Sequence, residues 1–105
     1  MQVVKLSYPA PPDRLETLIS LTKSSNLRHE LGTAFLQKGT RMPDDGKSTH
    51  SRHEVSVILE GKLSTTAGGI TTILEAGDIV SIPAGEPQFS LVLEDTRLIY
   101  VFFDD

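Results

Sequence analysis

The sequence contains no cysteine, which excludes disulfide bonds, thiolate metal ligands and a cysteine nucleophile. No apolar run approaches the roughly 20 residues of a membrane-spanning helix, and residues 1–12 lack the basic start and long apolar core of a signal peptide. The 10 Lys and Arg residues are scattered singly among 14 Asp and Glu residues, so no clustered basic surface for nucleic acid is evident. We therefore expect binding to neither nucleic acid nor membrane, and a cytoplasmic location.

Several catalytic motifs are also missing. There is no G-x-S-x-G sequence and no glycine-rich phosphate loop. Ser48 and Ser81 are candidates for a position near a cavity, but neither comes with a recognisable base and carboxylate. Serine catalysis is therefore not indicated.

What the 105 residues do contain is a series of short β-rich segments separated by Gly, Pro and Asp. The length favours one domain over residues 1–105, which we divide into an N-terminal segment (1–30) and a β-barrel core (31–105). A hairpin is predicted with its turn at Gly68-Gly69, where positive φ costs glycine little. The other predicted strands are 54–59, 79–82, 88–93 and 98–103, with a turn at 94–96 between the last two.

The first third of the chain allows two interpretations. Asp13 and Glu16 have the spacing of a helix capping box. The segment 15–22, however, is also rich in β-formers, and 23–26 ("KSSN") is a plausible turn into a strand at 31–37. We favour the hairpin, and the regular strand spacing without a long helix favours a sandwich or barrel.

Two glycine-framed blocks carry the most specific pattern. In the first, three residues separate His50 from Glu54, and six more separate Glu54 from Gly61. Fifteen residues separate Gly61 from Gly77, which opens the second block, G-x5-P-x-G. At these spacings the chain resembles the cupin superfamily, in particular small single-domain cupins. The resemblance implies an all-β fold, the cupin-type jelly-roll β-barrel.

The resemblance also implies a metal site, which this sequence keeps only in part. Family cupins commonly bind a divalent metal through two histidines and a glutamate of the first motif and a histidine of the second. These four positions fall on Ser48, His50, Glu54 and Gln88. Two of them keep their usual chemistry. Eight residues rather than five separate Gly39 from Ser48, so 43–47 ("PDDGK") is interpreted as a loop insertion.

Strand alternation predicts which side chains share the interior. If His50 and Glu54 face inward, His53 faces outward, because neighbouring residues of a strand point to opposite faces. The same parity adds Ser56 on one strand and Ser90 beside Gln88 on another. The predicted ligand-binding residues are Ser48, His50, Glu54, Ser56, Gln88 and Ser90.

The sequence allows two alternatives for this pocket, with and without a bound metal. His50, Glu54 and Gln88 could hold a divalent metal (Fe, Mn, Ni or Zn) loosely, with water completing the site. Alternatively no metal is bound, and His50 hydrogen-bonds Ser48 or Gln88. Because a buried unpaired carboxylate would be costly, Arg52 or Arg41 then neutralises Glu54, or Glu54 takes a proton.

The opposite strand face carries Val55, Val57 and Leu59 and needs a cover. We expect a homodimer, as the resemblance implies, although the chain's own N-terminal third is an alternative cover. For function, we expect a small-molecule-binding or sensing cupin. The alternative is a metal-dependent dioxygenase, isomerase or lyase acting on a small oxygenated substrate, as cupin relatives imply.

Overall fold

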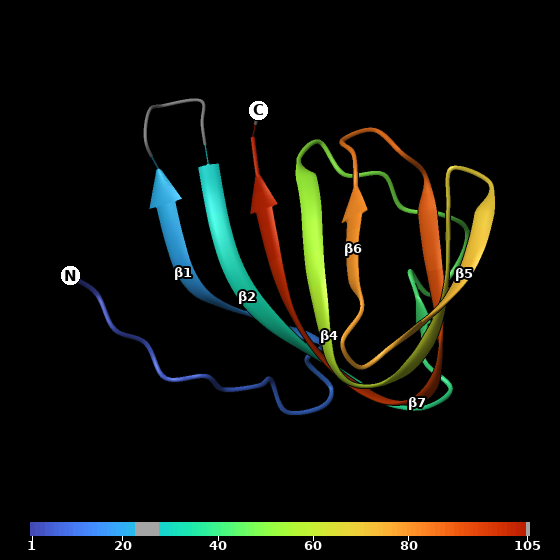
Figure 1. Ribbon diagram of the computed structural model, residues 1–105, viewed down its shortest axis with the longest axis horizontal. Helices are drawn as coiled ribbons and strands as arrows, with labels where there is room; N and C mark the ends of the chain where they lie inside the picture. Colours follow the sequence, from blue (N-terminus) through green and yellow to red (C-terminus); the bar gives the residue numbers. More distant parts are fainter. Residues whose placement is uncertain (23–27, 105) are drawn as a thin grey trace.

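The computed structural model describes residues 1–22 and 28–104, and within them the chain forms β-strands and no helix (Figure 1). This confirms the all-β prediction. In the same ranges, no helix has the length and apolarity of a membrane span. The strands are β1 (Leu15–Thr22), β2 (Arg28–Leu36), β3 (Arg41–Met42), β4 (His53–Ala67), β5 (Ile70–Glu75), β6 (Ile79–Ile82) and β7 (Gln88–Phe103).

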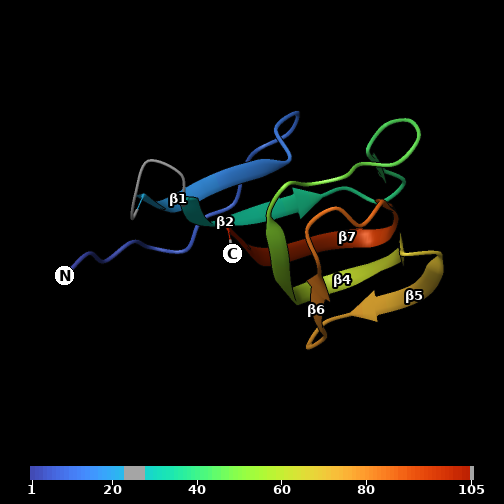
Figure 2. The same cartoon turned by 90° about the horizontal axis from the view of Figure 1, so that it is seen from above.

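All the strands belong to one antiparallel sheet with the order β1-β2-β7-β4-β5, while β6 pairs with β4 and β3 pairs with β7. The long strands β4 and β7 pair with each other from end to end and bend together. The sheet therefore curls around a concave face (Figure 2). It does not close into the continuous barrel that was expected, since β1 and β5 end the path of paired strands.

The predicted turn at 94–96 is wrong, because this segment is part of the unbroken strand β7. Glu94 pairs with Lys62 of β4, and the register shifts around Gly61, where β4 bulges and both strands bend. Gly61 has a φ of 96°, and a Cβ there would meet the backbone oxygen of Asp95 and the Cα of Thr96. The turn-forming residue types at 94–96 thus mark a bend within a strand, and Gly61 on the partner strand makes that bend possible.

Strand pairing places alternate side chains of neighbouring strands in rows across the concave face. Ile58, only 1% exposed, and Leu98 belong to the buried apolar cluster on this face. From β4 through β7 to β2, the rows are Glu54–Phe102–Glu30, Ser56–Tyr100–Gly32 and Ile58–Leu98–Ala34.

The N-terminal hairpin is confirmed, because β1 and β2 pair antiparallel and no helix forms at the potential capping box. The predicted turn at 23–26 lies outside the described residues. The hairpin extends the sheet at the edge of β7 (Figure 1).

The convex face of the sheet is covered in part by the chain itself. The hydroxyl of the fully buried Thr33 donates a hydrogen bond to the carbonyl of Ser7 at 2.5 Å, and the Arg97 guanidinium lies over the Tyr8 ring. Other apolar side chains on this face remain accessible, among them Ile79 at 70% exposure. The expected homodimer therefore stays a prediction.

We expect Gly61→Ala to lower the free energy of unfolding by about 3 kcal/mol, because it adds a steric clash to a strained φ. Gly77→Ala is the matched control: its φ is 93°, but a Cβ there meets nothing within 4 Å. The control should cost only about 1 kcal/mol. Urea unfolding of both variants measures the difference, and equal losses would contradict the role of close strand approach at Gly61.

Candidate functional site

A cavity of about 280 Å³ opens on the concave face of the sheet. Its walls are mostly apolar, and Lys and Arg are absent from its lining among the described residues. All six residues predicted to bind a ligand line it, although what they bind stays a prediction. The polar lining consists of Ser48, His50, Glu54, Ser56, Thr65, Gln88 and Ser90. The apolar lining includes Leu15, Ala34, Leu36, Met42, Ile58, Leu63, Leu74, Val80, Ile82, Leu98, Tyr100 and Phe102.

Backbone hydrogen bonds fix the segment before β4 against the start of β7. The Ser48 N–H donates to the Gln88 carbonyl at 2.8 Å, and the Gln88 N–H donates back to Ser48 at 2.9 Å. The Gly85 N–H donates to the carbonyl of His50, also at 2.8 Å. The two glycine-framed blocks are therefore joined directly, which brings His50 and Gln88 to the same end of the cavity.

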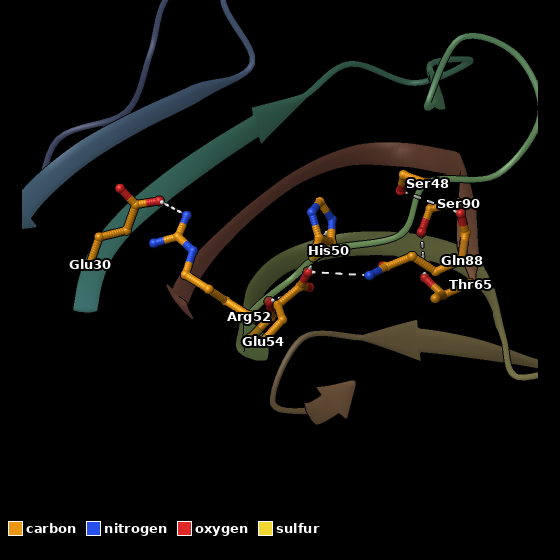
Figure 3. Close-up of polar contacts among 9 residues, drawn as sticks. Glu30, Ser48, His50, Arg52, Glu54, Thr65, Gln88 and Ser90 are labelled. Carbon is orange, nitrogen blue, oxygen red and sulfur yellow. Dashed lines mark hydrogen bonds and ion pairs between the residues drawn. The ribbon is translucent and has the colours of Figure 1, made fainter. Parts of the chain in front are cut away.

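Glu54 is the centre of the polar end (Figure 3). Its carboxylate accepts hydrogen bonds from the Ser56 hydroxyl at 3.2 Å and from the Gln88 side-chain amide at 3.5 Å. The His50 Nε2 lies 3.8 Å from the nearer carboxylate oxygen. The Glu54 side chain is 16% exposed and that of His50 41%, so the carboxylate lies deeper than the imidazole.

The prediction that Arg52 or Arg41 neutralises Glu54 is wrong. Arg52 forms an ion pair with Glu30 at 3.0 Å instead (Figure 3). Its guanidinium also lies 4.9 Å from the Phe102 ring centroid. Arg41 donates to two backbone carbonyls of the β3–β4 connection, each at 2.8 Å. Both arginines thus stabilise neighbouring structure and leave the carboxylate to neutral donors and His50.

His53 lies away from the cavity, as strand alternation indicates. Its Nε2 is 2.7 Å from the Ser81 hydroxyl, and its ring stacks on Phe103 with centroids 5.0 Å apart. Ser81 is likewise absent from the cavity lining. The histidine that is adjacent to Glu54 in sequence is therefore not its partner in space.

Sequence reasoning missed the aromatic side of the cavity. Tyr100 and Phe102 line it, with ring centroids 5.1 Å apart, and His50 lies 5.2 Å from Phe102. Like Gln88 and Ser90, both are even-numbered residues of β7. Continuing the strand alternation through 94–96 would therefore have predicted that they face the cavity. The predicted turn at that point prevented this inference.

Tyr100 is held in a position that only a glycine neighbour allows. A Cβ on Gly32 would collide with the Tyr100 hydroxyl. Burial is the largest effect on this phenol and raises its pKa, while a hydrogen bond with Thr17 acts in the opposite direction. Tyr100 therefore contributes a neutral ring to the cavity wall at neutral pH.

The donor set does not fit the four-ligand metal centre common among cupins. Only His50 and Glu54 are strong transition-metal ligands, and the described residues contain no group of three His, Cys, Asp or Glu side chains that could hold an ion. At the other two positions, the Ser48 hydroxyl donates to the Gln88 carbonyl and the Gln88 amide donates to Glu54. A metal here would have two strong protein ligands.

Comparisons with known proteins agree with the sequence motifs. A family model described as "Cupin domain" matches residues 33–101, about two thirds of the chain. An uncharacterized protein of Streptomyces coelicolor is 33% identical over 73 residues, which cover 69% of this chain and 67% of that protein. An acireductone dioxygenase of Geobacillus kaustophilus is 26% identical over 84 residues, 80% of this chain but only 45% of the enzyme.

A solved structure from Methanocaldococcus jannaschii, a cupin family protein with a double-stranded β-helix fold, superposes with a TM-score of 0.74. The sequence identity is 16%, and the match covers 97% of this chain and 89% of that one. The likeness confirms the jelly-roll fold predicted from the motifs.

We expect Tyr100 to ionise at higher pH than an ordinary tyrosine, whose pKa is 10.0. Because the folded state holds this proton more tightly than the unfolded state, Tyr100 contributes stability below pH 10 that is lost as pH rises through its folded pKa. In Tyr8→Phe, where Tyr100 is the remaining tyrosine, an ultraviolet titration should have its midpoint above pH 10.0. A midpoint at or below pH 10.0 would contradict this.

Proposed function

Because this chain belongs to the cupin family, we propose that it binds a small organic molecule in the cavity of the concave face, as a binding or sensing protein. The observation that carries the proposal is the make-up of that cavity. It combines a largely apolar wall with a few polar groups gathered around Glu54. Small-molecule sites typically have this composition, and about 280 Å³ is the size of a small ligand's site.

The arrangement suggests how a ligand would lie. Its apolar part would contact Ile58, Leu98 and their neighbours in the interior, where burial of apolar surface favours binding. Its polar end would meet the Glu54 carboxylate. The hydroxyls of Thr65 and Ser90, 2.7 Å apart, bond to each other and offer a second polar contact on the wall.

A metal-dependent enzyme is the second candidate function. The similarity to an acireductone dioxygenase favours it, together with the retention of His50 and Glu54 at two ligand positions. That enzyme is more than twice as long as the matched segment, so its activity is only a proposal for this chain. The incomplete donor set is the reason that we rank binding first.

To test binding, we expect saturation-transfer NMR to detect n-hexanol and cyclohexanol, two uncharged probes, on the wild-type protein. Ser90→Phe should abolish the signal by filling the cavity, whereas Leu91→Phe on the next residue should not, because Leu91 is exposed and outside the lining. Val80→Phe, on β6, is a second way to fill the cavity. Retained binding in both filled variants that still fold would place the ligand elsewhere.

To separate the two functions, metal content should be measured on protein purified without added ions. Under the binding proposal we expect well below one Fe, Mn, Ni or Zn per chain, because two strong ligands hold such ions weakly. A stoichiometric metal that disappears in His50→Ala but remains in His53→Ala would favour the enzyme. His53 is a suitable control because its imidazole bonds to Ser81 outside the cavity.

A further inference from the structure

We infer that the cavity selects ligands that carry a positively charged nitrogen, such as a primary or methylated ammonium group on an apolar body, over carboxylates. The inference deepens the proposed function and rests on it. It depends on the charges and rings around Glu54.

The first observation is that Glu54 faces the cavity without a fixed countercharge. Among residues 1–22 and 28–104, its one ion-pair partner is His50, at 3.8 Å, beyond hydrogen-bond distance. The groups that do bond to it, the Ser56 hydroxyl and the Gln88 amide, are both neutral. Apart from His50, the carboxylate is therefore surrounded by neutral hydrogen-bond donors, and no Lys or Arg lines the cavity beside it among the described residues.

The second observation concerns the charge balance of the row that contains Glu54. Cross-strand pairing places Glu54, Phe102 and Glu30 side by side on β4, β7 and β2. Arg52 compensates one of the two carboxylates by its ion pair with Glu30. One negative charge is left in the row, and it is the one that lines the cavity.

Burial makes this remaining charge selective. A carboxylate with a 16% exposed side chain has lost much of its water, and a ligand that fills the cavity would remove more. A ligand cation replaces that hydration with a charge-assisted hydrogen bond. A ligand carboxylate would instead add a second negative charge at short range, which is strongly unfavourable in a partly buried site.

The aromatic rings favour the same kind of ligand. The phenyl ring of Phe102 and the neutral phenol of Tyr100 both line the cavity, with ring centroids 5.1 Å apart. Ring faces attract cations, and aromatic groups combined with a carboxylate are a recurrent way to bind organic ammonium ions. Arg52 already makes such a contact with Phe102 within the protein.

The test compares three probes of equal length, n-hexylammonium, n-hexanol and n-hexanoate, by NMR titration at neutral pH. For the wild-type protein we expect the ammonium to bind at least about tenfold more tightly than the alcohol, with the carboxylate weakest. In Glu54→Gln, the ammonium and alcohol should bind about equally.

Glu60→Gln is the matched control. Glu60 lies on the same strand, is exposed, pairs with Arg97 and does not line the cavity, so its loss changes the net charge equally without altering the site. This variant should keep the preference for the ammonium. A general attraction of cations to an acidic protein would be reduced equally in both variants, and that result would overturn the inference.

Failure of the inference is distinguishable from failure of the proposed function. If the alcohol binds in the cavity but hexanoate binds as tightly as hexylammonium, the binding function stands and the inference is wrong. If none of the three probes binds, both are wrong. The wild-type comparison requires no substitution, so hexanoate binding as tightly as hexylammonium overturns the inference even if Glu54→Gln does not fold.

Discussion

The continuous antiparallel pairing of β4 with β7 is the constraint on which the rest of this structure depends. It determines which side chains face the concave side, and therefore which residues meet in the cavity. The bend of the two strands at Gly61 gives the sheet its curl. Across this bend β7 keeps one parity toward the cavity, whereas the bulge in β4 shifts the lining positions from 54, 56 and 58 to 63 and 65. The same pairing places Glu54 beside Phe102 and Ser56 beside Tyr100, so a polar strand segment meets an aromatic one.

The cavity that results is lined by the carboxylate of Glu54, whereas the nearby arginines bond to other parts of the chain. Arg41 donates hydrogen bonds to the β3–β4 connection, and Arg52 forms an ion pair with Glu30 on β2. Glu54 is left with hydrogen-bond donors that stabilise its carboxylate but do not neutralise it. In a metal centre, several strong ligands would instead converge on one point, so this division of roles supports the proposed binding of an organic ligand.

Much of this could be predicted from the sequence, because the informative spacings reflect strand pairing. The distances from His50 to Gly61 and from Gly77 to Gln88 indicated the fold, and alternation correctly separated Glu54 from His53. The aromatic wall could not be found once 94–96 was interpreted as a turn. Local composition does not reveal that Gly61, on another strand, permits a bend there. The sequence grouped Glu54 with His50, Ser56 and Gln88, but it could not reveal the partner of Arg52, because Arg52 reaches Glu30 through a contact between distant parts of the chain.

The two-way backbone bridge between Ser48 and Gln88 has a consequence for how such a site can diversify. Its bonds run between main-chain N–H and carbonyl groups, so they do not depend on which side chains stand at either position. A histidine, serine or glutamine can be exchanged there while the strands and the shape of the recess persist. Single substitutions at these two positions would thus change the polar groups of the cavity without removing the bridge that holds its two halves together.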